Sequence, residues 1–189
     1  MSRVTRDDIV IASSKRFAEF GYHGTSMRDL GDDLGILGSS IYSHVGGKHE
    51  LLVAVVERAS ELFTASAAGA LDSGGDAATV LLGLIRGHID VLVDNAAEAR
   101  TFLNEAGCLE APERAQVTKA RDAYEAVFRS TIKDGIDAGM FRTDIDPKLA
   151  GICVLSILNA TERWYHHDGE LSRESLAVDM HRFVIDGLT

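Results

Sequence analysis

A short stretch of the chain, GSSIYSHVGGKHELL (residues 38–52), places small polar residues ahead of a tyrosine, a histidine and a lysine. Tyr42, His44 and Lys48 follow one another at spacings of two and four. A phenol hydroxyl, an imidazole nitrogen and an ammonium group can all donate hydrogen bonds to phosphate oxygens, and a packed core does not require this pattern. The stretch therefore indicates a surface that lies against something large and negatively charged.

The residues around this stretch form two short helical patterns joined by a glycine. Thr25 is expected to be the N-cap of the first helix, and the second begins near Gly38. Gly35 follows Leu34 directly, where a helix that ends needs a left-handed residue, which glycine adopts without steric cost. This is a helix-turn-helix arrangement, and the apolar residues that hold its two helices together are Leu30, Leu34, Ile36 and Ile41.

Helical periodicity fills most of the remaining chain and predicts an all-α fold of about nine helices. A capping-box spacing at Thr5 and Asp8 starts the first helix, Asp146-Pro147 starts the eighth, and Ser172 caps the last. Residues 72–76 are the clearest linker. Besides the helix-turn-helix, helices are expected at about residues 6–20, 77–94, 96–108 and 112–138, and from 48, 147 and 173 onward. The expected inner side of the last helix is Leu176, Met180, Phe183, Val184 and Leu188.

Charge is distributed unevenly along the 189 residues, whose formal net charge is −10. Residues 1–50 carry six Lys or Arg and seven Asp or Glu, so this segment is close to neutral and the remainder is acidic. A nearly neutral segment attached to an acidic carrier fits a module that faces a polyanion, and it equally fits an ordinary acidic protein. The sign of the charge alone therefore does not decide the function.

Neither a signal peptide nor a membrane span is expected, so the sequence predicts a cytoplasmic protein. Arg3, Arg6 and Asp7 interrupt any apolar stretch at the start, and the longest apolar run covers only residues 149–158. Two isolated cysteines predict neither a disulfide nor a zinc framework. The adjacent histidines of His166-His167-Asp168 point apart in a loop, so no metal site and no cofactor are expected.

Residues 5–52 resemble the DNA-binding domain of TetR-type regulators, in FAEFGYHGTSMRDLGDDLGI and SSIYSHVGGKHELL. The resemblance implies a DNA-binding domain at 1–47 and a ligand-binding and dimerisation domain at 48–189. It implies that Tyr42 and His44 bond the sugar-phosphate backbone, and the ammonium of Lys48 at a helix N-terminus favours phosphate. Arg28 is the long side chain that could read a base. The predicted DNA-contacting residues are Thr25, Ser26, Arg28, Gly38, Ser39, Ser40, Tyr42, His44 and Lys48.

Three positions depart from the pattern of that family. Val45 stands where phenylalanine is usual, and Gly47 stands where a helix-capping serine or asparagine is usual. Gly31 replaces a common alanine, at a cost of about 1 kcal/mol in helix propensity. These departures loosen the domain but remove no phosphate contact.

The C-terminal part is similar to a branch of the family that represses fatty-acid, phenylacetate and steroid catabolism in response to acyl-CoA thioesters. The similarity lies in LNEAGCL, GIDAGMFRTDID, NATERWYHHDGELS and FVIDGL. It implies a pocket among the middle helices and a dimer formed by the last two. The candidate pocket residues, each of which could equally be core, are Leu62, Phe63, Leu84, His88, Leu92, Phe102, Tyr124, Phe128 and Val154. The candidate dimer residues are Ile152, Leu155, Asn159, Trp164, Tyr165, Leu176, Met180, Phe183 and Val184.

The function expected from these patterns is a ligand-responsive repressor that binds a palindromic operator as a homodimer. Its effector would be a small apolar molecule or an acyl-CoA, whose phosphates Arg100, Arg121 and Arg163 could meet. These arginines could equally lie on the surface or pair with acids such as Glu105 and Glu162. The alternatives are regulation of an efflux or other operon by a different hydrophobic effector, a thioester-handling enzyme, and a helical dimer that acts only through protein partners. An enzyme is not expected, because no nucleophile-elbow or phosphate-loop motif occurs.

Overall fold

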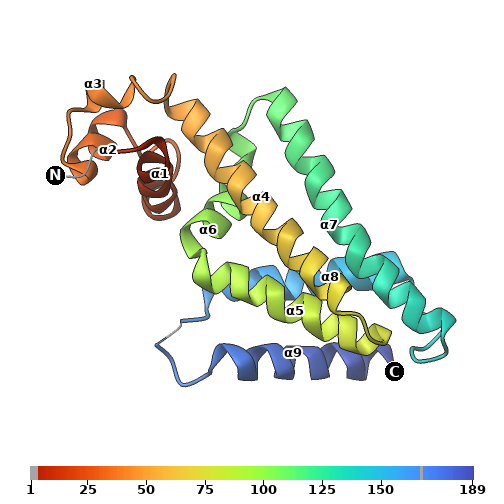
Figure 1. The fold of residues 1–189 in the computed structure, drawn as a ribbon. Helices are drawn as coiled ribbons and strands as arrows, with labels where there is room; N and C mark the ends of the chain where they lie inside the picture. The colour runs from red at the N-terminus through yellow and green to blue at the C-terminus, as the bar shows by residue number, and fades with distance from the viewer. Residues whose placement is uncertain (1–3, 167) are drawn as a thin grey trace. The chain divides into compact units, whose positions relative to one another are not determined.

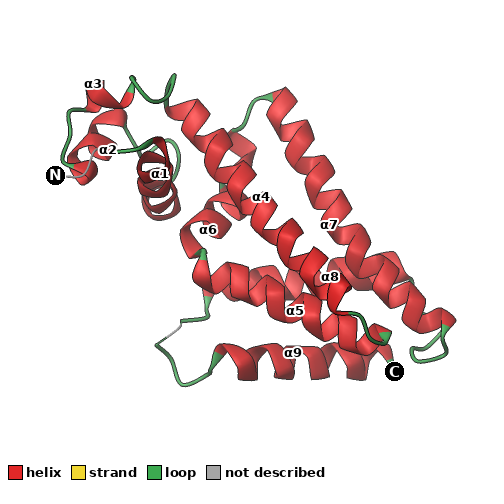
Figure 2. Cartoon of the chain, viewed as in Figure 1, coloured by secondary structure: helices red, strands yellow, loops and turns green. Residues whose placement is uncertain are grey.

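The computed structural model describes residues 4–166 and 168–189, and its regular elements are helices joined by loops (Figure 2). The described residues form nine α-helices, which confirms the expected all-α fold. In chain order they are α1 (Arg6–Phe20), α2 (Met27–Leu34), α3 (Gly38–Ile41), α4 (Lys48–Ser73), α5 (Ala77–Asp94), α6 (Ala96–Asn104), α7 (Ala111–Asp137), α8 (Pro147–Ala160) and α9 (Arg173–Leu188). Short 3₁₀ turns follow α6 at Ala106–Cys108 and α8 at Thr161–Arg163. His167, for which no metal role is expected, lies outside the described residues.

Side-chain caps set three of the helix starts where the sequence predicts them. The Thr5 hydroxyl accepts the backbone N–H of Asp8 at 3.2 Å, and the Asp8 carboxylate accepts the N–H of Thr5 at 2.8 Å, which is the expected capping box. Asp146 caps α8 and Ser172 caps α9, as expected. The start of α2 differs, because its N-cap is Ser26 and not Thr25.

The chain divides into two compact units, and α4 and α7 contribute residues to both. The N-terminal unit comprises the described residues up to Glu61 together with Asn95–Thr118, and the C-terminal unit comprises Leu62–Asp94 and Lys119–Thr189. The domain boundary predicted at residues 47 and 48 stays a prediction. None of the helices among the described residues is long and apolar enough to cross a membrane.

In the N-terminal unit, α1 packs against α2 and α6. Phe17, Leu30 and Ile41 are fully buried at the centre of the helix-turn-helix. The guanidinium group of Arg16 on α1 donates two hydrogen bonds to Asp33 on α2, at 2.6 and 2.8 Å. The apolar core and this two-point ion pair together fix the angle at which α2 presents the following turn.

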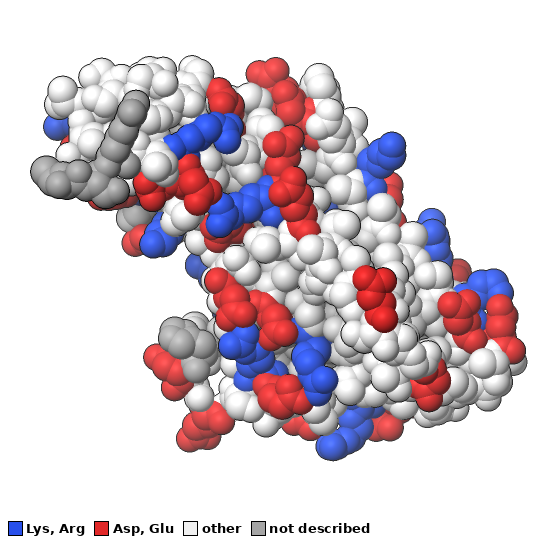
Figure 3. Space-filling view, in the orientation of Figure 1, with Lys and Arg blue, Asp and Glu red and all other residues white. Residues whose placement is uncertain are grey.

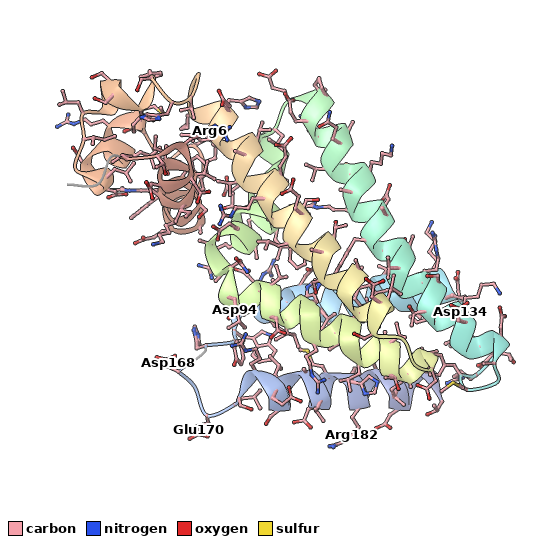
Figure 4. All side chains as sticks on the ribbon, in the orientation of Figure 1. Arg6, Asp94, Asp134, Asp168, Glu170 and Arg182 are labelled. Carbon is pink, nitrogen blue, oxygen red and sulfur yellow. The ribbon has the colours of Figure 1, made fainter. Side chains whose placement is uncertain are left out.

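In the C-terminal unit, α5 lies beside α9 and also contacts α8 (Figure 1). One apolar core joins these helices to the second half of α7, and its fully buried members include Leu81, Ile85, Ile89, Phe128 and Ile132. Arg173 at the start of α9 pairs with Asp90 at 3.2 Å and with Asp94 at 2.7 Å; Asp94, the last residue of α5, is labelled in Figure 4. These pairs tie the start of α9 to the end of α5.

Candidate nucleic-acid interface and effector site

The turn between α2 and α3 is built on a left-handed glycine, as expected. Gly35 has φ 66° and ψ 30°, and the next residue, Ile36, donates its backbone N–H to the carbonyl of Gly31 at 2.9 Å. This bond satisfies one of the carbonyls left free at the end of α2. The chain therefore leaves α2 and enters α3 within three residues, Gly35, Ile36 and Leu37.

Gly31 and Gly38 allow α2 and α3 to approach each other at backbone distance. A Cβ atom placed on Gly31 would lie 2.7 Å from the nitrogen of Gly38 and 2.8 Å from the carbonyl oxygen of Ile36. A Cβ atom on Gly38 would lie 2.9 Å from the carbonyl oxygen of Met27. The glycine at 31, which looks unfavourable from helix propensity, is therefore required by packing, and Gly38 has a structural reason that is independent of any DNA contact.

Helix α3 is a single turn whose outer side carries the residues expected to contact DNA. Ser39 and Ser40 are exposed, and Tyr42, the C-cap residue, is 57% exposed, whereas Ile41 is fully buried. His44 is half-buried just beyond the turn. In Figure 3 the surface over α3 is free of charged side chains on the side shown. Residues 38–47 contain no Lys, Arg, Asp or Glu, so this hydroxyl-rich surface imposes little repulsion on a polyanion.

Ser26, and not Thr25, is the residue that caps α2. Ser26 caps α2 by accepting the N–H of Asp29 at 3.2 Å, and its own hydroxyl donates to the Asp29 carboxylate at 2.7 Å. Thr25 is only 2% exposed, and its hydroxyl donates to the carbonyl of Gly21 at 3.0 Å. The expectation that Thr25 caps α2 is therefore wrong, because its hydroxyl closes the loop between α1 and α2. That Thr25 contacts DNA stays a prediction.

Lys48 lies at the first position of α4, as predicted, but its ammonium group faces the protein. Its Nζ donates hydrogen bonds to the backbone carbonyls of Tyr22 and Thr25, each at 2.8 Å, and lies 4.3 Å from the centre of the Tyr22 ring. An ammonium group has three donors, so these two bonds leave one for another acceptor. Lys48 therefore holds the loop between α1 and α2 against the start of α4.

Glu50 organises the loop between α3 and α4. Its carboxylate accepts the backbone N–H of Gly46 at 2.7 Å and a hydrogen bond from the Arg6 guanidinium at 3.1 Å. These two bonds, the first being the stronger influence, hold the pKa of the Glu50 carboxyl below its usual range. The loop that follows Tyr42 and His44 is therefore fixed to α4 and to α1.

Two further residues are exposed beside α3. Arg28 on α2 is exposed and forms no ion pair with another described residue, which leaves its guanidinium group available for a base or phosphate. Leu37, the N-cap residue of α3, is 75% exposed and was not among the predicted contact residues. An apolar side chain at the start of a reading helix suits contact with a thymine methyl group. The turn glycine two residues earlier is the signal that could have identified it.

The structure brings together four of the predicted effector residues in the C-terminal unit. The ring centres of Phe63 and His88 are 4.8 Å apart, those of Phe63 and Tyr124 are 5.6 Å apart, and those of Tyr124 and Phe128 are 5.4 Å apart. Nδ1 of His88 lies within 3.0 Å of the Tyr124 hydroxyl. The second half of α4, together with α5 and α7, thus contributes to one buried aromatic cluster with a polar pair inside it.

Burial controls the protonation of this cluster. His88 is 2% exposed, and loss of hydration lowers the pKa of its imidazole to about 3, although the nearby Asn159 side chain partly opposes this effect. Burial also raises the pKa of the Tyr124 hydroxyl. His88 Nε2 has no hydrogen-bond partner within normal geometry among the described residues. The cluster therefore contains a neutral imidazole whose Nδ1 lies beside the Tyr124 hydroxyl and whose ring also interacts with the Asn159 side chain.

The other predicted pocket residues differ in burial and do not all lie in the same unit. Leu84 and Val154 belong to the same apolar core as Phe128, Leu92 is buried, and Leu62 is half-buried. Phe102 is buried in the N-terminal unit. A hollow of about 580 Å³ opens elsewhere, along the outer side of α7 at the start of α8, and none of the predicted pocket residues lines it. That the predicted residues enclose an effector stays a prediction.

The predicted dimer residues divide into exposed and buried groups. Ile152 on α8, Trp164 after it and Phe183 on α9 are exposed, at 43%, 50% and 67%. Leu176 and Val184 are buried in the core of their own unit, so their expected place on the dimer surface is wrong. The remaining four, Leu155, Asn159, Tyr165 and Met180, are half-buried.

The structure also corrects the inner side expected for α9. Phe183 was expected to face inward along the helix, but its side chain lies on the outside of its unit, where it remains available as a dimer residue. Beside it, Arg182 points away from α9 (Figure 4). Asn159 instead hydrogen-bonds the buried His88, which places it beside the aromatic cluster of Phe63, His88, Tyr124 and Phe128. The arginines suggested for CoA phosphates, Arg100, Arg121 and Arg163, are exposed, and that role stays a prediction.

Comparison with solved structures shows the same fold in transcriptional regulators. PfmR from Thermus thermophilus, a TetR family transcriptional regulator, is 31% identical, with a TM-score of 0.87 over 96% of this chain and 98% of PfmR. The ketosteroid transcriptional regulator KstR2 of Mycobacterium tuberculosis has a TM-score of 0.92, covering 100% of this chain and 97% of KstR2 at 23% identity. AibR, solved with isovaleryl coenzyme A and operator DNA, has a TM-score of 0.85, covering 94% of this chain and 96% of AibR at 20% identity.

Sequence comparison agrees with the structural one. The transcriptional repressor KstR2 of Mycobacterium tuberculosis is 24% identical over 185 residues, which cover 97% of this chain and 92% of KstR2. The family model for bacterial regulatory proteins of the tetR family matches residues 9–55. The model for the tetracyclin repressor-like C-terminal domain matches residues 74–188. The chain therefore belongs to the TetR family of DNA-binding transcriptional regulators, and not to a class of enzymes.

Proposed function

We propose that this chain is a dimeric cytoplasmic repressor that binds a palindromic operator and leaves it when a hydrophobic effector of the acyl-CoA type binds. The observation that carries the proposal is the exposed row of Ser39, Ser40 and Tyr42 on the helix that follows the Gly35 turn. The fold is shared with KstR2, which is named a repressor, and with AibR, which was solved with both an acyl-CoA and operator DNA. These relatives support the effector class.

In this proposal the two α3 helices of a dimer enter successive major grooves, about 34 Å apart. Ser39 and Ser40 contact base edges or phosphate, Tyr42 and His44 contact the sugar-phosphate backbone, and Arg28 reaches a base. Lys48 acts mainly by fixing the loop between α1 and α2, and adds its charge to the phosphate side. The exposed apolar residues Ile152 and Phe183 supply the surface that pairs the two subunits.

The effector in this proposal binds beside the His88–Tyr124 pair. A carbonyl oxygen or hydroxyl of the effector hydrogen-bonds Nε2 of His88, a buried atom with no partner of normal geometry, in place of the nearby Asn159 side chain. The rings of Phe63 and Phe128 offer an apolar surface to the acyl group. A neutral imidazole favours an uncharged polar group, such as a thioester carbonyl, over a carboxylate.

Helix α4 connects effector binding to operator release, because Lys48 is its first residue and Phe63 lies in its second half. An acyl group that displaces the Phe63 ring shifts this helix, and the shift changes how Lys48 holds the loop before α2. The coupling is reciprocal: operator DNA must weaken effector binding by the same factor by which the effector weakens DNA binding, typically about 1–3 kcal/mol.

The test uses the purified full chain and DNA fragments from upstream of its own coding region and from the genome. We expect retardation of a palindromic fragment at low salt, and its reversal by at least one of a short, a long or an aromatic acyl-CoA. Calorimetry with the same compounds reports binding directly, and His88→Gln serves as the matched variant for the effector site. Absence of retardation on every fragment contradicts the repressor. If acyl-CoAs have no effect and only a hydrophobic compound without a thioester releases the DNA, the effector belongs to another chemical class.

A further inference from the structure

A histidine and two glutamates meet inside the N-terminal unit, away from α3. His49 comes from the first turn of α4, Glu113 from the first turn of α7, and Glu110 immediately precedes α7. One ligand atom from each of the three side chains lies within 4.8 Å of the others, and His49 Nε2 is 3.9 Å from Glu113 Oε1. One nitrogen and two carboxylate oxygens therefore converge from two helices that are about sixty residues apart in the sequence.

Two of the converging side chains hold polar atoms that lack partners. Nε2 of His49 and Oε2 of Glu113 are both shielded from solvent and form no hydrogen bond with another described residue. The side chains themselves are about one-third exposed, at 34% and 31%, so solvent ions can reach the group. An ion pair between a protonated His49 and Glu113 would engage Oε1 and leave Oε2 unpaired. A shared cation would satisfy both atoms at once.

We infer that His49, Glu110 and Glu113 bind a divalent transition-metal ion of the Zn²⁺ class, with water completing its coordination. Zn²⁺ holds nitrogen and oxygen ligands at about 2.0–2.2 Å, so neighbouring donor atoms of a tetrahedral site lie about 3.4 Å apart. The 3.9 Å separation of His49 and Glu113 is close to that value, and the exposed Glu110 can close the remaining distance by rotating its side chain. The imidazole ligand favours Zn²⁺, Co²⁺ or Ni²⁺ over Mg²⁺ or Ca²⁺.

A metal ion at this position joins the first turn of α4 to the first turn of α7. Lys48 and Glu50, which flank His49, are the residues that fix the loops before α2 and before α4. An ion that binds only the folded protein stabilises it in proportion to the logarithm of the free ion concentration. The metal therefore stabilises the start of α4 in a way that does not depend on an operator or an effector.

The experiment uses the full chain after treatment with a chelator and dialysis. We expect Co²⁺ to produce visible absorption bands that saturate at one ion per chain, Zn²⁺ to displace it, and Zn²⁺ to raise the melting temperature. His49→Gln and Glu113→Gln should each weaken the affinity for Zn²⁺ at least tenfold, as loss of a ligand or of its support commonly does. Far-UV circular dichroism checks that each variant is folded, and Glu110→Gln provides a third, solvent-exposed change.

Cys108→Ser is the matched control, because the Sγ atom of Cys108 lies 3.6 Å from Nε2 of His23 in the same unit and forms the rival metal-binding pair. Unchanged Zn²⁺ affinity in Cys108→Ser supports the site at His49. Loss of binding in Cys108→Ser with retention in His49→Gln overturns it, as does the absence of saturable Co²⁺ binding to the unmodified chain. These measurements need no DNA and no effector, so a negative result for the metal site leaves the repressor proposal unaffected, and the reverse also holds.

Discussion

Nδ1 of His88 lies 3.0 Å from the hydroxyl oxygen of Tyr124, in a buried part of the C-terminal unit where neither group carries a charge at neutral pH. The pair joins α5 to α7 through a hydrogen bond whose direction depends on the imidazole tautomer. Because the partner group is a phenol and not a carboxylate, nothing in the pair favours the imidazolium ion. The His88–Tyr124 pair therefore makes the stability of the protein sensitive to acid.

The first prediction concerns the stability of the protein between neutral and acidic pH. His88 has a pKa of about 3 when folded and an ordinary value of 6.5, so above 6.5 it is neutral in both states and its contribution is complete. As the pH falls below 6.5 only the unfolded chain binds the proton, and the free energy of unfolding drops by about 1.4 kcal/mol per pH unit. Urea denaturation at several pH values should show this slope, and His88→Gln should reduce it.

His166→Gln is the control for that measurement, because His166 is exposed in a loop. It should leave the pH dependence unchanged. An equal slope in the unmodified chain and in His88→Gln would show that His88 is accessible to protons in the folded protein.

The second prediction concerns the close approach of α2 and α3. Gly31→Ala gains up to about 1 kcal/mol of helix propensity, but its Cβ meets backbone atoms of the α2–α3 turn within 3 Å, and these cannot move without shifting α3. The Cβ of Gly31→Ala would lie within 3 Å of three backbone atoms in all, the nitrogen and Cα of Gly38 and the carbonyl oxygen of Ile36. We therefore expect Gly31→Ala to lower the free energy of unfolding, with overpacking of this kind costing about 1–3 kcal/mol.

Gly69→Ala in α4 is the matched control, since a Cβ atom there would have no described neighbour within 4 Å. Gly69→Ala should raise the free energy of unfolding by a fraction of the ~1 kcal/mol by which alanine exceeds glycine in helix propensity. If both variants gain stability in urea denaturation, the packing of Gly31 against Gly38 is not as tight as the structure indicates.

The third prediction separates two residues that were both expected to contact phosphate. Tyr42→Phe removes one exposed hydroxyl and should weaken operator binding by about 0.5–1.5 kcal/mol with no change in stability. Lys48→Ala removes the two hydrogen bonds to the carbonyls of Tyr22 and Thr25, so it should reduce stability as well as DNA affinity.

Fluorescence anisotropy with labelled operator and thermal denaturation of the same samples test both changes. If the Lys48→Ala protein melts normally but no longer binds DNA, Lys48 contacts phosphate directly and does not act by fixing the loop before α2. A Tyr42→Phe protein with full affinity would remove the Tyr42 hydroxyl from the interface.

The fourth prediction concerns the subunit interface. Phe183 is 67% exposed on α9, and Phe183→Glu places a charge on an apolar surface that pairing would have to bury. We expect sedimentation to show a shift from dimer to monomer, together with weaker operator binding. Arg182→Ala, next to it on α9, should leave the dimer intact; an equal effect of both variants would place the interface elsewhere.

Local signals in the sequence predicted the helices well. The capping box at Thr5 and Asp8, the Gly35 turn and the Ser172 cap depend on residues within four positions of one another, and all three are present. The confusion of Thr25 with Ser26 arose because either hydroxyl could cap α2. The carbonyl of Gly21, which accepts the Thr25 hydroxyl, decided between them through the fold of the loop.

Contacts between distant segments could not be predicted in this way. The ammonium of Lys48 bonds to carbonyls more than twenty residues earlier, and His49 meets Glu113 across more than sixty. For Phe183, helical periodicity placed the side chain inward, yet the neighbouring Val184 takes the buried position in the core. Which of two neighbouring apolar side chains is buried depends on which helix packs against them, and a single sequence does not specify that packing.

The contact between the backbones of α2 and α3 limits how this protein can acquire a new operator. Position 38 accepts no side chain larger than hydrogen, because the carbonyl of Met27 occupies the space that a Cβ would need. Leu37, Ser39 and Ser40 are exposed and carry no such restriction. Within the first residues of α3, evolution or engineering of a different target sequence can therefore substitute these three neighbours but cannot substitute Gly38.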